Sequence, residues 1–257
     1  MSESTAVLLF VPGLLVSRRA FDATRAALRA GAAVRVADVE HQDSIEAMAD
    51  DAWAALADLP AEATLVVCGW SMGGYVVLRM LETARRPIDG LALVCTSGRA
   101  DSPETAELRK RAVESIGRDF ARHVALLSRT LLAPGDAASD AGLVAAVRAD
   151  MADVGAATAL RQQRAAGARP ARGEVLRSYG GPVLVVSAEG DLVTPPALSR
   201  ELAGFARDVE HDAIPTTGHL VPFEHPARLA ARLDALVGRA ERHRRHALAR
   251  PAMSAGS

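Results

Sequence analysis

Ser71 lies between a short apolar run and a helix-forming run, at the centre of a Gly-x-Ser-x-Gly pattern. Residues 64–68 are apolar or β-branched, which is typical of a buried parallel strand, and residues 75–81 favour a helix. A strand that turns this sharply into a helix strains its middle residue, and the flanking glycines allow close packing. The turn also places the Ser71 hydroxyl at a helix N-terminus, where backbone N–H groups stabilise negative charge. We therefore predict that Ser71 is a nucleophile, against the alternative of a structural turn.

A serine nucleophile needs a base that takes its proton, and His219 has a suitable position for that role. It lies in a loop directly after the last predicted strand, residues 209–214. The carboxyl ends of parallel strands share one edge of a sheet, so this loop returns to the side of Ser71. We predict that His219 is the base. Four other histidines are interpreted as surface or packing residues: His41, His123, His211 and His225.

The base needs an acid that orients its ring, and two carboxylates follow the predicted strand at residues 183–187. Asp191 lies further into the turn, just ahead of Thr194-Pro195-Pro196, which would fix the loop. We therefore predict that Asp191 is the acid, with Glu189 as the alternative. The order along the chain is then Ser, Asp, His.

The elements that must position these residues alternate regularly, each apolar strand being followed by a helical pattern. This alternation predicts an α/β fold with a mostly parallel sheet and helices on both faces. The strands are predicted at residues 6–11, 33–36, 64–68, 90–95, 183–187 and 209–214.

The alternation stops between residues 99 and 177, where the pattern is helical throughout. Ser102-Pro103-Glu104 is typical of a helix start, with proline at the first helical position. We therefore predict a helical insertion in one α/β core. The predicted parts are a first core segment at 1–98, the insertion at 99–177, a second core segment at 178–247 and a disordered tail at 248–257.

The composition suits one such domain, because 49% of the 257 residues are apolar. A net charge of −1 gives no bulk attraction to nucleic acid or to an anionic membrane, and no apolar run is long enough for a membrane span. The apolar run at residues 7–16 is interrupted by Pro12-Gly13 and lacks a basic leader, so it is not expected to be a signal peptide. Cys68 and Cys95 are interpreted as buried free thiols. These features predict a cytoplasmic protein.

Over residues 7–237 the chain resembles the α/β-hydrolase fold family. Residues 69–74 are similar to its nucleophile turn, Gly190-Asp191 to its acid turn and Gly218-His219 to its histidine loop. The signals at residues 162–164 and 169–170 are similar to those of small capped members, often bacterial esterases, lactonases and related synthases.

This resemblance implies about six parallel strands and places the helical insertion as a cap over Ser71. It also implies an oxyanion hole formed by the backbone N–H groups of Leu14 and Met72. Pro12-Gly13 stands where the family usually has His-Gly.

The expected activity is hydrolysis of a small to medium carboxylic ester or lactone, with no cofactor and no metal. The alternatives are acyl transfer or carbon–carbon lyase or synthase chemistry with the same three residues, and a non-enzymatic ligand receptor on this fold. Arg161, Arg164 and Arg169 are candidates for binding a substrate carboxylate, against the alternative of a solvated face. The expected partner is the small-molecule substrate alone, and the pattern makes no prediction of oligomeric state.

Overall fold

The computed structural model describes residues 6–249 and contains one sheet of six parallel strands in the order β2-β1-β3-β4-β5-β6. This confirms the predicted fold class. The strands are β1 Ala6–Val11, β2 Ala33–Val36, β3 Thr64–Trp70, β4 Gly90–Val94, β5 Val183–Ala188 and β6 Val209–Ile214.

The central strand β3 pairs with β1 on one side and with β4 on the other. It runs two residues beyond the predicted strand, because Gly69 pairs with Val11 and Trp70 pairs with Val94. All the strands are parallel, so the loops after β1, β3, β5 and β6 leave the same edge of the sheet. The strand order reverses beside β1, and in such sheets ligands bind outside the carboxyl ends at this point.

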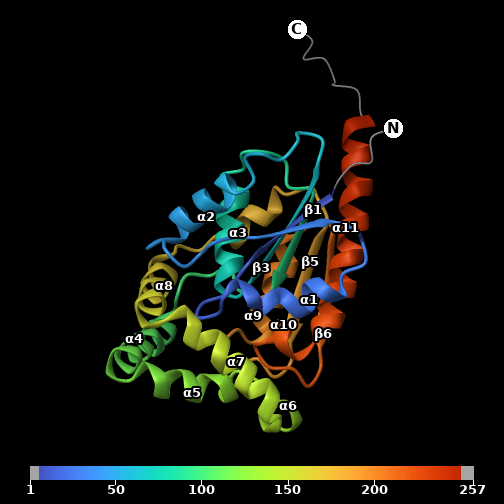
Figure 1. Cartoon of the computed structure of the whole chain (residues 1–257). Coiled ribbons are helices and arrows are strands. Elements are labelled where there is room, and N and C mark those ends of the chain that lie inside the picture. Colours follow the sequence, from blue (N-terminus) through green and yellow to red (C-terminus); the bar gives the residue numbers. More distant parts are fainter. Residues whose placement is uncertain (1–5, 250–257) are drawn as a thin grey trace.

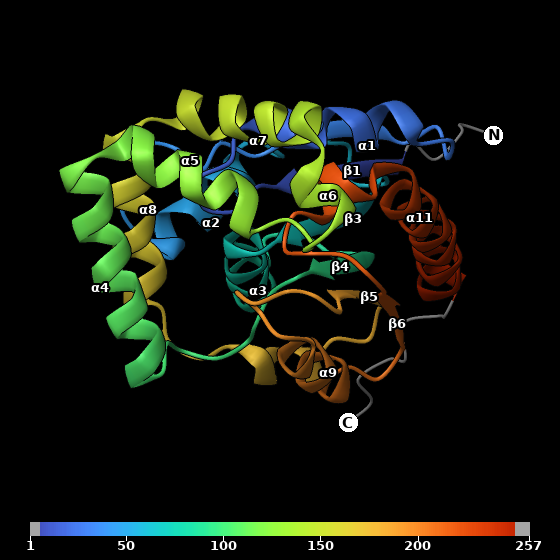
Figure 2. The ribbon, with the colours of Figure 1, turned by 90° about the horizontal axis from the view of Figure 1, so that it is seen from below.

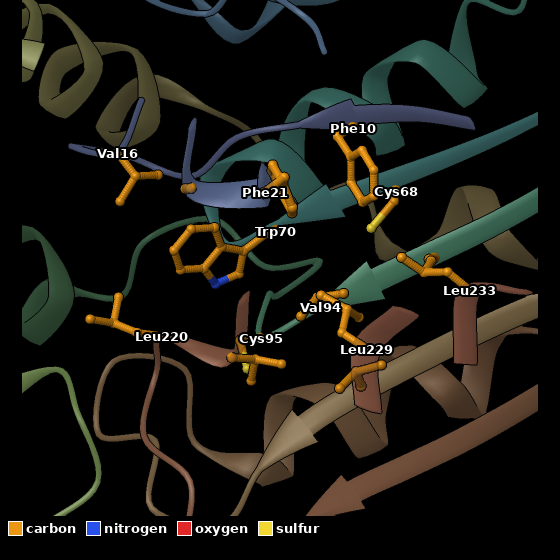
Figure 3. Packing of buried hydrophobic residues seen from close by; sticks show 14 of the residues in the cluster. Phe10, Val16, Phe21, Cys68, Trp70, Val94, Cys95, Leu220, Leu229 and Leu233 are labelled. Carbon is orange, nitrogen blue, oxygen red and sulfur yellow. The ribbon is translucent and has the colours of Figure 1, made fainter. Parts of the chain in front are cut away.

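Alternate side chains of the strands enter two apolar clusters, one on each face of the sheet. Leu8 and Phe10 belong to the cluster that the short 3-10 helix η1 and α11 complete, whereas Leu9 and Val11 belong to the one with residues of α2 and α3. Figure 1 shows these helices beside the sheet, and Figure 3 shows Phe10 beside Phe21 in the first cluster. The helices that lie beside the sheet are η1 Arg18–Phe21, α1 Asp22–Ala27, α2 Ile45–Ala54, α3 Met72–Glu82, α9 Pro196–Phe205, α10 Val221–Glu224 and α11 Pro226–Ala249.

Between β4 and β5 the chain forms five α-helices, followed by a short 3-10 helix, η2, over Gly173–Arg177. Ser102 caps the first of them by accepting a hydrogen bond from the Thr105 N–H, and Pro103 occupies its first turn. Asp119 is extended and caps the second helix, so it separates the two. We call this group the helical segment: α4 Pro103–Arg118, α5 Phe120–Thr130, α6 Asp136–Ser139, α7 Ala141–Val154 and α8 Ala156–Ala168.

The helical segment gathers at the lower end of the sheet in Figure 1. Figure 2 shows that α4, α5, α7 and α8 cover one side of that end, while α9 lies on the other side. At the far end of the chain, α11 includes Leu248 and Ala249, which we expected in the tail, and residues 250–257 lie outside the described residues. Within residues 6–249 no helix is both long and apolar enough to cross a membrane.

Candidate active site

Ser71 occupies the sharp turn between β3 and α3 with φ 54° and ψ −117°, in a region that non-glycine residues rarely adopt. The turn requires glycine on both sides. A Cβ added to Gly69 would overlap the carbonyl of Gly73, and one added to Gly73 would overlap the carbonyl of Val11. The Gly-x-Ser-x-Gly pattern therefore permits three backbone segments to meet at Ser71.

Backbone and side-chain hydrogen bonds hold the Ser71 peptide groups in this strained conformation. The Ser71 N–H donates to the Val94 carbonyl at 2.9 Å, which ties the turn to β4. The Ser71 carbonyl accepts from the Gly74 N–H at 2.9 Å and from the Thr96 hydroxyl at 2.7 Å. Such strain persists only where the surroundings over-determine it, as they do here.

The structure brings the side chains of Ser71, His219 and Asp191 into one hydrogen-bonded chain. His219 Nε2 lies 2.9 Å from Ser71 Oγ, and His219 Nδ1 lies 2.8 Å from Asp191 Oδ2. Asp191 is only 2% exposed and His219 6% exposed. Glu189, the alternative acid, is exposed on the same loop, and its side chain makes no described contact with the ring of His219.

The carboxylate of Asp191 is held by the residues that follow it. Oδ1 accepts hydrogen bonds from the Val193 and Thr194 N–H groups at 2.8 and 2.9 Å, and Oδ2 accepts from the Thr194 hydroxyl at 2.6 Å. Burial alone would raise the pKa of Asp191, but the interactions with His219 and Thr194 outweigh it and leave this pKa below its ordinary value. The group is therefore an ionised carboxylate at neutral pH that faces the Nδ1 edge of the imidazole.

The backbone of His219 is fixed from two sides. Its N–H donates to the Leu131 carbonyl at 2.7 Å, and its carbonyl accepts from the indole N–H of Trp70 at 3.1 Å. Leu131 belongs to the helical segment's α5–α6 connection, and Trp70 immediately precedes Ser71. The position of the imidazole thus depends on both the sheet and the helical segment.

Glu224 joins the same two parts of the structure. Its carboxylate accepts hydrogen bonds from the Gly218 N–H at 3.1 Å and from the Ala133 N–H at 2.9 Å. A Cβ at Gly218 would overlap the Leu131 carbonyl, so glycine is needed for this close approach. Sequence analysis did not identify Glu224, because no periodic pattern marks a carboxylate that binds one nearby amide, that of Gly218, and one distant amide, that of Ala133.

Of the two predicted oxyanion donors, Met72 directly follows Ser71, and Leu14 directly follows Gly13, which lies near Ser71. Gly13 leaves little space beside the serine, because a Cβ added at Gly13 would lie 3.3 Å from Ser71 Cβ. Met72 is the first residue of α3. Among the described residues, neither the Leu14 nor the Met72 N–H has a protein acceptor. Both amides are therefore available to a ligand.

Two buried polar side chains of the helical segment bind the loop after β1, and sequence analysis assigned them no such role. Gln162 Oε1 accepts from the Leu15 N–H at 2.8 Å, and its Nε2 donates to the Val39 carbonyl at 3.0 Å. The Asp150 carboxylate accepts from the Ser17 N–H at 2.9 Å and from its hydroxyl at 2.5 Å. The only feature of the local sequence that could have indicated Asp150 and Gln162 is that each is a polar residue among the buried positions of its helix, α7 or α8.

The three candidate arginines differ in what surrounds them. Arg161 donates to the Glu40 carbonyl at 2.8 Å. Arg169 is buried in an ion pair with Asp101 at 2.6 Å, and its guanidinium stacks on a tyrosine of α3 at 3.7 Å. Arg164 is exposed. Arg161 and Arg169 thus bind the protein itself, which argues against their use for a substrate carboxylate.

A cleft of about 570 Å³ lies beside the His219 loop, and residues of α6, α7 and this loop line it. Neither Ser71 nor His219 is among its lining residues, but Glu224, which binds the amide of Gly218 next to His219, is. Donor atoms that could together hold a metal ion belong to Cys95, Asp191 and His219.

Comparison with known proteins agrees with this fold. The model of the alpha/beta hydrolase fold family matches residues 13–226. The chain belongs to this family, as its sequence predicts.

One relative is the pimeloyl-[acyl-carrier protein] methyl ester esterase of Neisseria meningitidis serogroup A. It is 30% identical over 217 residues, which cover 79% of this chain and 67% of the relative. Relatives of the same name from other strains of that species match over 60 or 61% of their length.

Solved structures extend the likeness to nearly the whole chain. A thermophilic esterase from Thermogutta terrifontis shares 25% identity with a TM-score of 0.80, over 92% of this chain and 90% of its own. The enol-lactonase of Burkholderia xenovorans shares 19% identity with a TM-score of 0.78, over 92% of each chain, and shows the fold alone. The relatives are enzymes, so the prediction of an enzyme on this fold is confirmed.

Proposed function

We propose that the protein hydrolyses a small to medium carboxylic ester or lactone. Ser71 is the nucleophile, His219 is the base, and Asp191 positions the imidazole. The observation that supports this most strongly is the continuous chain from Ser71 Oγ through His219 to Asp191, with separations of 2.9 and 2.8 Å. A serine, a base and an oriented acid in this geometry are the arrangement that activates a hydroxyl for attack on a carbonyl.

In the first half of the reaction, Ser71 Oγ attacks the carbonyl carbon of the substrate while His219 Nε2 takes the hydroxyl proton. The carbonyl oxygen becomes an oxyanion, which the free N–H groups of Leu14 and Met72 stabilise. When the intermediate collapses, the bond to the leaving alkoxide breaks and His219 returns the proton to it. An ester releases its alcohol at this point, whereas a lactone keeps the new hydroxyl attached to the acyl group.

In the second half, water attacks the acyl group on Ser71. His219 takes a proton from the water, the bond to Ser71 Oγ breaks, and the serine recovers its proton from the imidazole. Asp191 stays ionised throughout and stabilises the imidazolium that forms in each half. The carboxylic acid then leaves.

Two relatives named as esterases support an ester over other acyl substrates: the neisserial methyl ester esterase and the Thermogutta enzyme. We further propose that the helical segment, α4 to α8, is the cap, because it binds both the His219 loop and the loop after β1. Acyl transfer and carbon–carbon bond chemistry stay the alternatives for the same three residues. A cytoplasmic location stays a prediction from the sequence.

The test is covalent labelling of purified protein with a fluorophosphonate, followed by mass analysis of the peptide that contains Ser71. We expect one label on Ser71 and none in the Ser71→Ala variant. Ser187→Ala is the matched control, because Ser187 also lies beside a histidine, with its Oγ 2.9 Å from His211 Nε2. Ser187 is far along the chain from Ser71, so this variant should still be labelled on Ser71. Labelling elsewhere, or an unlabelled Ser71 in folded protein, would contradict the proposal.

A second measurement separates hydrolysis from acyl transfer. With p-nitrophenyl butyrate we expect a butyryl group on Ser71 and release of butyrate in water. If an added alcohol or thiol acceptor were converted to its butyryl ester or thioester first, and butyrate appeared only after the acceptor had been consumed, acyl transfer would be favoured instead.

A further inference from the structure

Cys95 lies directly against the hydrogen-bonded chain, although neither the sequence motifs nor the proposed reaction assigns it a role. Cys95 follows β4 and is fully buried. Its backbone φ is 45°, a positive value that residues other than glycine rarely adopt. Its sulfur, a carboxylate oxygen of Asp191 and a ring nitrogen of His219 all lie within 4.8 Å of one another. Figure 3 shows Cys95 in the same apolar cluster as Trp70 and Leu220.

The surroundings of Cys95 differ from those of Cys68, the other free cysteine. Burial alone raises the pKa of the Cys68 thiol. For Cys95, burial raises the pKa first, and the charge and hydrogen-bond acceptance of Asp191 add to it. The Cys95 thiol is therefore a protonated donor to the carboxylate at neutral pH and not a reactive nucleophile.

We propose that Cys95, Asp191 and His219 form an inhibitory binding site for a thiophilic divalent cation such as Zn²⁺. A thiolate sulfur, an imidazole nitrogen and a carboxylate oxygen are the three ligand types that zinc takes in proteins. The Thr194 hydroxyl lies 2.6 Å from Asp191 Oδ2 and 3.4 Å from His219 Nδ1, so it or a water can fill the fourth position. Magnesium and calcium prefer six or more oxygens and do not suit this set.

Binding requires small movements within the cluster. Zinc bonds of about 2.0 to 2.3 Å place neighbouring ligand atoms well beyond hydrogen-bond distance. The 2.8 Å contact between His219 Nδ1 and Asp191 Oδ2 must therefore lengthen, while the Cys95 sulfur moves closer. Because all three donors are buried, we expect inhibition to develop slowly.

The ion stops turnover by changing which ring nitrogen carries the proton. In the proposed reaction His219 holds a proton on Nδ1, facing Asp191, and accepts the Ser71 proton on Nε2. The metal takes the Nδ1 lone pair, so that proton moves to Nε2, and the thiol proton of Cys95 is lost to solvent. One proton is released for each ion bound, and an Nε2 that carries a proton cannot accept another from Ser71.

Cobalt absorption tests the binding without any need for activity. Co²⁺ is added to metal-free wild type, Cys95→Ala and Cys68→Ala, and to Ser71→Ala. We expect a thiolate-to-cobalt charge-transfer band in wild type, Cys68→Ala and Ser71→Ala, and none in Cys95→Ala. Cys95→Ser gives the same comparison if the alanine variant does not fold. A missing band in wild type, or one that survives in both Cys95 variants, would overturn the site.

Zinc inhibition then tests the consequence for the reaction, and only this part depends on the proposed function. Each variant's esterase rate with Zn²⁺ is divided by its own rate in EDTA. We expect wild type and Cys68→Ala to be inhibited reversibly, Mg²⁺ to have no effect, and the inhibition constant to rise by more than about tenfold without the Cys95 thiol. Equal inhibition of Cys95→Ala would mean that zinc acts elsewhere, for instance directly between Ser71 and His219 Nε2.

Discussion

The side-chain carbonyl of Gln162 accepts a 2.8 Å hydrogen bond from the backbone N–H of Leu15. Leu15 follows Leu14, the proposed oxyanion donor, and has a φ of 60°. Gln162 is fully buried on α8, more than a hundred residues later in the chain. One side chain of the helical segment therefore holds the backbone next to the proposed oxyanion donor Leu14.

Replacing Gln162 by leucine should lower kcat more than it raises KM. The change keeps most of the volume but leaves the buried Leu15 N–H and Val39 carbonyl without partners, so the loop loses its position. We expect kcat to fall by up to about 100-fold, as for loss of an oxyanion donor. Steady-state kinetics with p-nitrophenyl butyrate measure both constants.

Gln163→Leu is the matched control on the same helix. Gln163 is also buried, but its Oε1 accepts a hydrogen bond from Arg109 and not from the loop after β1. This variant should lose stability with kcat near that of wild type. If both variants lowered kcat equally, the link from Gln162 to the oxyanion loop would lose its support.

Asp191→Asn should leave a folded protein whose kcat/KM is lower by about 10⁴-fold. The asparagine oxygen can still accept from the Val193 and Thr194 N–H groups, so the loop persists. The charge that orients and stabilises the imidazole is lost. Glu189→Gln, on the same loop, should stay close to wild type. If Glu189→Gln lost activity and Asp191→Asn did not in the same esterase assay, Glu189 and not Asp191 would be the acid.

Asp101→Asn should destabilise the protein at neutral pH by about 3–5 kcal/mol, because it leaves the buried Arg169 and the half-buried Arg109 without their carboxylate. Burial tends to raise the pKa of Asp101, but the two guanidinium groups outweigh it and lower this pKa. The stabilisation is therefore complete above the unfolded pKa of about 4 and is lost as the pH falls through the lower folded value.

Urea unfolding of wild type and Asp101→Asn at several pH values tests this dependence. The difference in unfolding free energy should be large at pH 7 and should shrink in acid, below about pH 4. Glu107→Gln removes an exposed ion pair with Arg111 and should change stability by less than about 1 kcal/mol. A difference between wild type and Asp101→Asn that stayed constant down to acid pH would show that the carboxylate charge is not the cause.

Ser71→Ala and His219→Ala should each lower kcat by about 10⁴-fold or more, and the double variant should be hardly worse. The two residues act as one unit, so removal of either abolishes the same proton transfer. Initial rates of p-nitrophenyl acetate hydrolysis compare the three variants with wild type. Effects that multiplied in the double variant would show that the residues act in separate steps.

The strands could be predicted because their signals are local. The runs at residues 6–11 and 209–214 have the bounds of β1 and β6, and Ser71, Asp191 and His219 each stand just after a predicted strand. Since parallel strands end at one edge, a sheet of this kind brings such residues together. The structure does place the three side chains in contact, and their roles stay proposals.

The contacts that support these three residues could not be predicted in the same way. The Trp70 indole binds the His219 carbonyl, Glu224 binds the distant Ala133 amide, and Gln162 binds the loop after β1. Each joins a side chain to the backbone of a remote segment, and no periodicity or spacing encodes such a pair. Cys95 was correctly interpreted as a buried free thiol, but only the fold brings it to Asp191.

The attachment of the helical segment has a consequence for protein engineering. Leu131 binds His219, Asp150 binds Ser17 and Gln162 binds Leu15, so the segment is joined to the core at the active-site loops themselves. A chimera that received residues 99–177 from a relative would also replace these three supports of the candidate active-site loops. A graft that keeps the three anchoring contacts is therefore the one expected to leave these loops in position.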